Sequence, residues 1–188
     1  MEQQTHFFFA VRIPETTKII MAKHLEKLKK NLPFHRWVHH EDLHITLAFL
    51  GFAPAEKLAR AEKNMKEAII DSKAFQLQIN RLGTFGKEDA PRVFWADVVE
   101  SSELQLLRRK VVMACEHAGF QLDTRDFRPH ITLARKWVGN DAFQKELLTV
   151  WSKLQLEPLA FVANDVVLYQ THLQRMPKYE AKTVFQLE

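Results

Sequence analysis

The stretch that decides the fold is LHITLAFLG, Leu43–Gly51, because its centre is spelled again in PHITLAR, Pro129–Arg135. Five consecutive residues, His-Ile-Thr-Leu-Ala, occur in both places, 86 positions apart, in a chain with no other obvious repeat. Each copy alternates a polar with an aliphatic residue, the pattern of a strand that has one buried face. Each strand therefore presents one imidazole and one hydroxyl on its open face.

The repeat extends beyond the five shared residues. FFA (Phe8–Ala10) and FWA (Phe94–Ala96) precede the two copies at the same distance, 36 residues from phenylalanine to histidine. Each half then consists of a strand, a helix, a His-Ile-Thr-Leu strand, a helix and a strand. This predicts two similar lobes related by a pseudo-two-fold axis, with one composite site between them. No linker separates the lobes, so we expect a single domain over residues 1–188, with its motifs at 44–47 and 130–133.

Hydrophobic periodicity predicts the other elements. Short runs rich in aromatic and β-branched residues favour buried strands, and apolar residues three and four apart favour amphipathic helices. A segment with two Gly and one Pro within nine residues favours a loop. The expected strands cover residues 7–13, 43–51, 75–83, 92–100, 128–135, 159–170 and 180–188. The expected helices cover residues 15–31, 54–71, 102–117 and 141–154, and the expected loop covers residues 83–91.

The composition is that of an ordinary globular protein, with 46% hydrophobic and 27% charged residues. The net charge of +4 mildly favours an anionic partner. A single cysteine, Cys115, excludes an internal disulfide and fits a reducing compartment. The first residues lack the features of a signal peptide, and no apolar run reaches the ~18 residues of a membrane span. We therefore expect a cytoplasmic monomer that does not associate with membranes.

The two motifs together supply the groups that in-line phosphoester cleavage can use. One imidazole, from His44 or His130, can take a proton from the attacking water while the other protonates the leaving oxygen. Histidine suits both roles because its ordinary pKa, about 6.5, lies close to neutrality. The hydroxyls of Thr46 and Thr132 can donate hydrogen bonds to the oxygens that gather charge in the transition state. This scheme requires no metal and no cofactor.

Arg135, three residues after Thr132, is a further candidate for phosphate binding. Its guanidinium group can bind a phosphate through two parallel hydrogen bonds. Strict strand alternation would place Arg135 on the face opposite Thr132. The phosphate-binding role therefore requires a bulge or a strand end near Ala134.

At these residues the sequence resembles a known family. HITLAFLG and HITLAR resemble the paired His-x-Thr-x motifs of the 2H phosphoesterase superfamily. Within it, HFFFAVRIP, LHITLAFLG, RVFWADV and GFQLDTRDFRPHITLAR are similar to the RNA 2′,3′-cyclic phosphodiesterases, also called 2′-5′ RNA ligases. The resemblance runs from about Phe7 into the last strand, and so covers nearly the whole chain.

The resemblance implies an α+β, bilobal fold, in which two pseudo-symmetric lobes of mainly antiparallel sheet line a central cleft and the helices lie outside. It also implies metal-independent hydrolysis of a terminal 2′,3′-cyclic phosphate of RNA or oligonucleotides to a 2′-phosphate. The family roles carry over to His44 as proton donor and His130 as proton acceptor. The phosphate-binding positions fall on Thr46, Thr132 and Arg135.

Two other functions remain open at the level of sequence. The same site could join a 5′-hydroxyl to the cyclic end through a 2′-5′ bond, because a ribose hydroxyl can replace water. Alternatively, the protein could bind RNA ends without catalysis. Analysis of the products with both ends supplied separates the two reactions, and turnover by itself separates either reaction from binding.

Several other residues are predicted to be solvated or to lie in the core, with no role in catalysis. The sequence HHEDLH (residues 39–44) matches no helical zinc motif and is expected to form a solvated loop. Arg125 and Arg128 are expected to be solvated. Phe9, Trp95 and Cys115 are expected in the core. The family often has Phe-Pro in the loop that follows Phe85, whereas this chain has FGKED there. A base-stacking role is therefore not assigned to Phe85.

Overall fold

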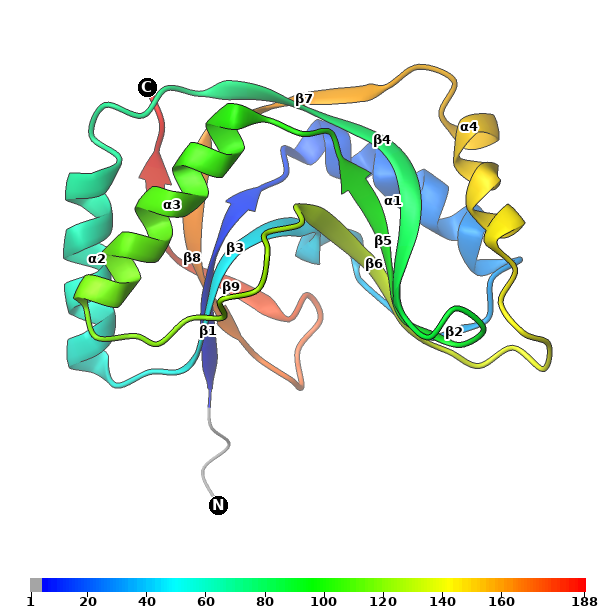
Figure 1. The fold of residues 1–188 in the computed structure, drawn as a ribbon, viewed down its shortest axis with the longest axis horizontal. Coiled ribbons are helices and arrows are strands. Elements are labelled where there is room, and N and C mark those ends of the chain that lie inside the picture. The colour runs from blue at the N-terminus through cyan, green and yellow to red at the C-terminus, as the bar shows by residue number, and fades with distance from the viewer. Residues whose placement is uncertain (1–4) are drawn as a thin grey trace.

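The computed structural model describes residues 5–188, which form two antiparallel sheets with helices around them (Figure 1). Sheet A has the strand order β3 (His44–Phe52), β1 (His6–Arg12), β8 (Asp165–Thr171) and β9 (Tyr179–Gln186). Sheet B has the order β2 (Phe34–Trp37), β6 (His130–Trp137), β5 (Pro91–Val98), β4 (Phe75–Gly86) and β7 (Leu159–Ala163). The expected α+β, bilobal architecture is confirmed, with one motif strand in each sheet.

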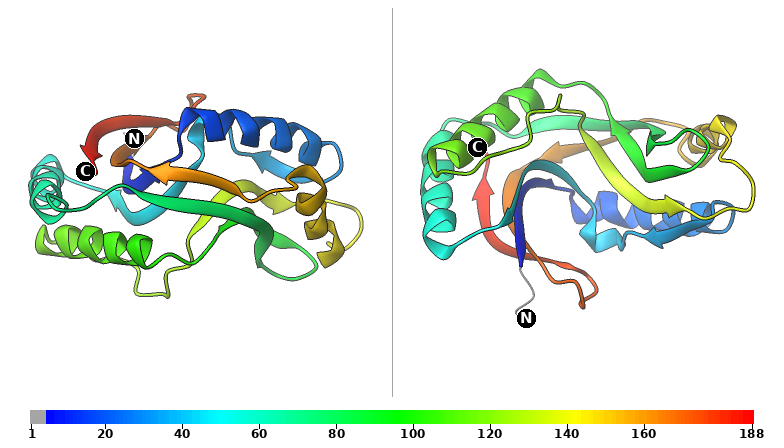
Figure 2. Two further views of the ribbon diagram at one scale, coloured as in Figure 1. Left: turned by 90° about the horizontal axis from the view of Figure 1, so that it is seen from above. Right: turned by 60° about the horizontal axis from the view of Figure 1, so that its bottom comes forward.

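The two sheets are interleaved along the chain. β4 precedes β5 and belongs to sheet B, whereas β8 and β9, at the end of the chain, return to sheet A. Each lobe is therefore built from both halves of the sequence. Figure 2 shows this exchange from two directions, with the last strands lying beside the first.

The helices are distributed in the same crossed way. α1 (Glu15–Lys29) follows β1, and its His24 packs edge-on against Trp151 of α4 (Val150–Leu154). α2 (Ala55–Ala68) and α3 (Ser102–His117) pack against each other, and α3 lies against β3 although it follows β5 of sheet B. Helix packing thus couples the two sheets. Two short 3₁₀ segments, η1 (His40–Asp42) and η2 (Lys145–Thr149), complete the fold.

The burial of the side chains confirms the alternation predicted for the two motif strands. Ile45 and Leu47 of β3 are buried, as are Ile131 and Leu133 of β6, while the histidines and threonines between them are partly exposed. The buried aliphatic side chains anchor each strand, since each contributes about 1.5–3 kcal/mol when it is removed from water.

The expected loop at residues 83–91 is wrong over its first part, because β4 continues to Gly86 and pairs with β5. Gly83 permits close packing here. A Cβ atom at Gly83 would lie 2.2 Å from the indole ring of Trp95, so this glycine allows the ring to lie against the neighbouring strand.

Two further boundaries differ from the prediction. The expected helix at residues 141–154 is helical only in η2 and α4, because the Phe143 N–H donates to Asp89 O and holds the chain away from a helical path. The expected strand at residues 159–170 is divided at Asn164, since β7 and β8 belong to different sheets. The four-residue β2 was not predicted, because so short a segment has no distinct periodicity.

The equivalence of FFA and FWA is wrong by one residue. Ala10 pairs with Thr46, but it is Trp95, not Ala96, that pairs with Thr132. A shift of one position moves a strand side chain to the other face. Trp95 therefore lies on the same face as Thr132 and not in the core as expected, while Phe9 is buried as expected.

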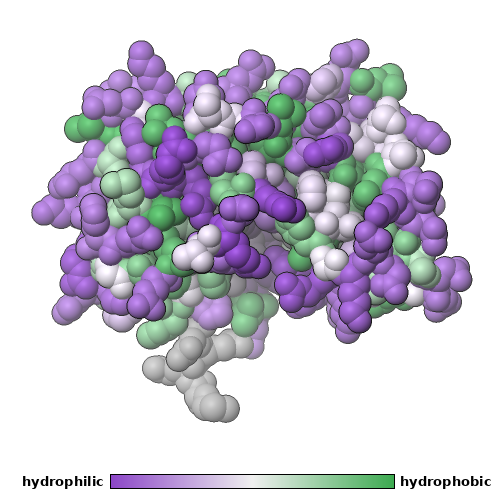
Figure 3. Space-filling model, viewed as in Figure 1, coloured by the Kyte–Doolittle hydropathy of each residue, from purple (hydrophilic) through white to green (hydrophobic). Residues whose placement is uncertain are grey.

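The surface drawn in Figure 3 is mostly hydrophilic, with hydrophobic residues scattered over it in small groups. Among residues 5–188, no helix has the length and apolar character needed to span a membrane.

Candidate active site

His44 is the first residue of β3, and its ring is oriented by the backbone. Nδ1 lies 2.7 Å from the carbonyl oxygen of Asp42. Because a carbonyl only accepts hydrogen bonds, Nδ1 must carry the proton. In the neutral ring Nε2 then has a free lone pair, and it accepts a hydrogen bond from the Thr46 hydroxyl at 3.0 Å. Nε2 is therefore the nitrogen of His44 that can accept a proton.

His130 is held in the same way at the start of β6. Its Nδ1 donates to the carbonyl oxygen of Arg128 at 2.7 Å, again two residues before the histidine. The ring packs edge-on against Phe85, with centroids 5.0 Å apart, and lies 6.1 Å from the ring of Trp95. Nε2 of His130 therefore also carries the free lone pair.

A bulge follows the threonine in both motif strands. In β3 the ladder passes from Thr46 to Ala48 on adjacent partners, so that Leu47 is an extra residue. In β6 it passes from Thr132 to Ala134, and Leu133 is the extra residue. Each bulge returns the next outward residue to the face of the histidine and threonine.

Arg135 is placed by this bulge on the same face as Thr132. It pairs with Val93 of β5, two residues from Trp95, which pairs with Thr132. The bulge that the phosphate-binding role of Arg135 requires is thus present. Within residues 5–188, Arg135 has no carboxylate partner, whereas the guanidinium groups of four other arginines do: Arg12, Arg81, Arg125 and Arg175.

Phe49 occupies the corresponding position in β3, and our sequence reasoning did not select it. It pairs with Phe8, stands on the same face as Thr46 and is 57% exposed. The signal was present in the sequence, because the sixth residue of the repeated motif is Phe in HITLAF and Arg in HITLAR. One strand thus offers an aromatic ring where the other offers a cation.

The face of sheet A that carries His44, here called the A face, has an aromatic wall. The His44 ring lies 4.8 Å from Phe8 and packs edge-on against Tyr179 at 5.1 Å. Phe8 also stacks on Tyr169 at 5.3 Å. These contacts limit the movement of the imidazole, so its Nε2 is held in one direction.

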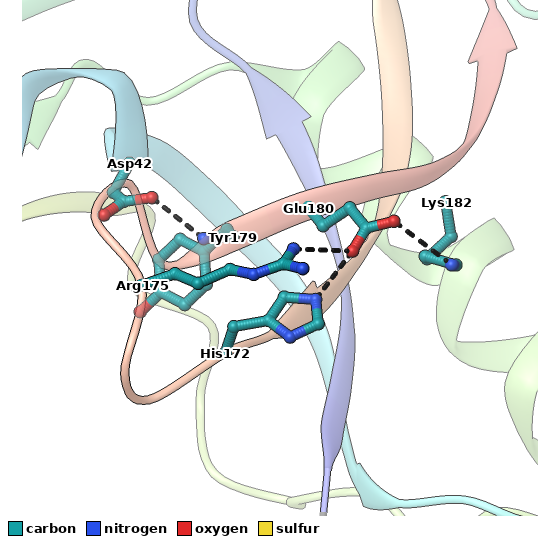
Figure 4. Close-up of polar contacts among 6 residues, drawn as sticks. All are labelled: Asp42, His172, Arg175, Tyr179, Glu180 and Lys182. Atoms are coloured by element: carbon teal, nitrogen blue, oxygen red, sulfur yellow. Dashed lines mark hydrogen bonds and ion pairs between the residues drawn. The ribbon is translucent and has the colours of Figure 1, made fainter.

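Asp42 connects His44 to the hairpin between β8 and β9. Its buried carboxylate accepts hydrogen bonds from the backbone N–H groups of Lys178, at 2.9 Å, and Tyr179, at 3.0 Å. Figure 4 shows this carboxylate beside Tyr179, while Glu180 is contacted by a separate group of side chains. The Asp42 backbone thus orients the imidazole while its side chain holds the hairpin that carries Tyr179.

The pKa values of both histidines lie below the ordinary value. Burial lowers the pKa of His44 to about 4, against the opposing effects of the Asp42 carbonyl and carboxylate. Burial also lowers the pKa of His130, and the positive charge of Arg135 lowers it further. Without a bound anion, both rings are neutral at pH 7.

The two motif strands approach each other across the sheets. β3 contacts β6, and the two imidazoles are close enough that a proton on His130 would lower the pKa of His44. Burial raises the pKa of Tyr179, and Arg135, from the other sheet, acts against this rise. The A face and the face of sheet B that carries His130 and Thr132, here called the B face, therefore border one site.

The residues that were predicted to be solvated or to lie in the core, with no role in catalysis, lie mostly as expected. Arg125 and Arg128 are exposed, and Arg125 pairs with Asp123. Cys115 is buried, which raises the pKa of its thiol to about 12. The segment before His44 contains the short turn η1 in place of an open loop. Across residues 5–188, no three His, Cys, Asp or Glu side chains are grouped closely enough to hold a metal ion.

The two-sheet fold and the paired His-x-Thr strands are those expected of the 2H phosphoesterase superfamily, and comparison with protein families agrees. The family model described as the 2′-5′ RNA ligase superfamily matches residues 20–175, so the chain belongs to this superfamily. Two curated relatives are both called RNA 2′,3′-cyclic phosphodiesterase. The one from Geobacillus stearothermophilus is 42% identical over 98% of this chain, and the one from Bacillus subtilis is 34% identical over 97%. The chain spans 58% of the length of the first and 96% of the second.

Solved structures share the fold at lower identity. The protein TT0787 of Thermus thermophilus superimposes with a TM-score of 0.77 at 23% identity, covering 97% of each chain. E. coli LigT, crystallised with 3′-AMP, gives a TM-score of 0.76 at 23% identity, covering 98% of this chain and 99% of LigT. These likenesses support the bilobal fold.

Proposed function

We propose that this protein is a cyclic phosphodiesterase that hydrolyses the terminal 2′,3′-cyclic phosphate of RNA or oligonucleotides to a 2′-phosphate. The observation that carries the proposal is the matched pair of imidazoles. Each has Nδ1 bound to a backbone carbonyl, which leaves Nε2 with the lone pair, and the two strands that carry them contact each other. The names of the two curated relatives support the choice of substrate.

In the proposed reaction His130 acts as the general base. Its Nε2 takes a proton from a water molecule as the water oxygen attacks phosphorus. The lowered pKa of His130 supports this role, because the ring must be neutral to accept the proton. Arg135, on the same face, can bind the non-bridging oxygens through both arms of its guanidinium group.

His44 acts as the general acid in the same step. As the bond between phosphorus and O3′ breaks, Nε2 of His44 gives its proton to O3′, leaving a 3′-hydroxyl and a 2′-phosphate. The ring must first be protonated, and the negative charge of the bound phosphate raises its pKa from the value of about 4 in the free protein. The Asp42 carboxylate acts in the same direction, because its negative charge favours the protonated form of His44.

Thr46 and Thr132 flank the phosphate as hydroxyl donors. The Thr46 hydroxyl already bonds Nε2 of His44, so it can transfer this hydrogen bond to the substrate when the ring is protonated. The exposed ring of Phe49 stands next along the A face and can stack on the terminal base.

We also propose that residues 1–188 form one cytoplasmic, monomeric domain. The exchange of strands and helices between the lobes supports a single folding unit. The buried, unpaired Cys115 is compatible with a reducing compartment. Sedimentation analysis tests the oligomeric state, and a dimer at micromolar concentration would contradict that part of the proposal.

The test of function uses an oligonucleotide that ends in a 2′,3′-cyclic phosphate, incubated with the protein in EDTA. The expected product carries a 2′-phosphate, and His44→Ala and His130→Ala form it at least about 100-fold more slowly. Adding a 5′-hydroxyl oligonucleotide distinguishes hydrolysis from 2′-5′ ligation. Affinity for the end without turnover would identify a binding module instead and would overturn the proposal.

A further inference from the structure

The pairing between β1 and β3 spaces four side chains evenly along the A face. Successive partners on β1 are two residues apart, which corresponds to about 7 Å along the strand. From the reactive end outward, the pairs are Arg12 with His44, Ala10 with Thr46, Phe8 with Phe49, and His6 with Phe52. The series therefore begins at the candidate acid and ends at a second phenylalanine.

Phe52 reaches this face because of a second bulge in β3. The ladder passes from Phe49 to Gly51 on adjacent partners, and Leu50 is the extra residue. Gly51 has a φ of 66°, a left-handed conformation that glycine adopts without strain. The ring of His6, the partner of Phe52, lies edge-on to Phe49 at 5.6 Å, so the two outermost pairs share one face.

Both outer phenylalanines are left open to solvent, Phe49 at 57% and Phe52 at 56%. A single exposed aromatic residue is ordinary on a protein surface. Two such rings in line with the proposed phosphate site extend that site with aromatic surface, and the ring of His6, the strand partner of Phe52, contacts Phe49. An aromatic ring on a strand is what RNA-binding sheets use to stack bases.

We propose that Phe52, with His6, stacks on the penultimate base of the RNA, next to the terminal base on Phe49. This inference rests on the proposed function, because the terminal nucleotide sets the position of its neighbour. The spacing of about 7 Å is twice the ~3.4 Å between stacked bases, so each base is splayed onto its own ring. The site therefore recognises a dinucleotide end rather than a single nucleotide.

The equivalent positions of the other motif carry no second pair of exposed aromatic rings. The residues 86 positions after Phe49 and Phe52 are Arg135 and Val138. They offer a guanidinium group and a small aliphatic side chain in place of two aromatic rings. At these two positions the B face thus offers a group for the phosphate, whereas the A face offers rings for bases.

The test compares kcat/KM for two substrates, a mononucleoside 2′,3′-cyclic phosphate and a dinucleotide with the same terminal base and cyclic end. Stacking on one aromatic side chain is worth a factor of about 5 to 150. We expect Phe52→Ala to lower the dinucleotide-to-mononucleotide ratio of kcat/KM by a factor in this range, and Phe52→Trp to restore it. Ile70→Ala, which truncates an exposed apolar side chain far from the site in sequence, is the matched control and keeps the wild-type ratio.

The outcomes separate this inference from the proposed function. Equal loss on both substrates, or no loss on either, would overturn the role of Phe52. Wild-type dimers that become monomers in Phe52→Ala would also overturn it, by identifying the ring as a dimer contact. If the wild type hydrolyses neither substrate, the proposed function fails. The role of Phe52 is then tested by measuring the affinity of the protein for the 2′-phosphorylated mononucleotide and dinucleotide. Loss of the preference for the dinucleotide in Phe52→Ala supports this role, and an unchanged preference refutes it.

Discussion

β3 and β6 share five consecutive residues and the same local geometry, yet they present different chemistry. In each strand the histidine Nδ1 donates to the carbonyl two residues earlier, and the leucine after the threonine is the extra residue of a bulge. The flanks differ. Asp42 precedes His44 by two residues and Arg128 precedes His130 by two residues. Phe49 and Arg135 follow the same histidines by five residues.

The shared residues and the flanking residues of the two motifs have different effects. The shared pentapeptide builds a strand that holds an imidazole and a hydroxyl in a defined direction. The flanking residues then determine the charge and the surface around each imidazole, and so the role of each copy. A carboxylate lies behind His44, while a guanidinium group that lowers the pKa of its neighbour lies beside His130.

The largest expected effect comes from removing either imidazole. His44→Ala and His130→Ala should each lower turnover of a cyclic phosphate end by about 10²–10⁴-fold, the usual contribution of a positioned acid or base. The double variant should lose little more, because the two groups act in one step. Initial rates measure the effect, and circular dichroism verifies folding. Retention of more than a tenth of wild-type activity in either folded variant would contradict the mechanism.

Variants of Arg135 test the difference between β3 and β6 at the fifth position after the histidine. Arg135→Ala should lower turnover by about 10²–10³-fold, as loss of a transition-state donor does. Arg135→Lys should restore only part of the rate, because an ammonium group cannot bind two phosphate oxygens in fork geometry. Arg125→Ala removes an exposed arginine that already has a carboxylate partner and serves as the control. Equal effects of Arg135→Ala and Arg125→Ala would refute a phosphate-binding role.

Variants of Asp42 and Arg128 test the difference between the two motifs at the second position before the histidine. Asp42→Ala leaves two backbone N–H donors without their acceptor, which costs about 1–3 kcal/mol for each buried donor. Asp42→Asn keeps one oxygen and should cost less. Arg128→Ala alters an exposed side chain and should change the free energy of unfolding by less than about 0.5 kcal/mol. Urea unfolding measures all three, and similar values for Asp42→Ala and Arg128→Ala would show that the hairpin does not depend on the carboxylate.

The smallest effect expected is on the pH dependence of stability. The pKa of His44 is about 4 in the folded protein against an ordinary value of 6.5, so between these values the unfolded chain binds a proton that the folded chain does not. The contribution of neutral His44 to stability is therefore present above pH 6.5 and is lost as the pH falls toward 4. His44→Gln should reduce this loss in urea unfolding at pH 7 and pH 4.5. His35→Gln, at an exposed position of β2, is the control, and an unchanged pH dependence in His44→Gln would disprove the burial effect.

Much of the fold could be predicted because strong periodicity survives in the folded chain. The helix expected at residues 102–117 is α3, and both motif strands begin within two residues of their expected starts. The failures occur where long-range contacts override local pattern. Residues 84–86 were predicted to lie in a loop but extend strand β4, and the run from residue 159 is divided between two sheets.

The candidate site was predictable to the extent that it is local. The repeated His-Ile-Thr-Leu-Ala pattern determined by itself which side chains face outward, since alternation in a strand depends only on backbone geometry. The exposure of Phe49 and Phe52 and the return of Arg135 to the B face depend on bulges, which form only when a partner strand is in register. Only the tertiary structure, therefore, could decide which residues beyond each threonine belong to the site.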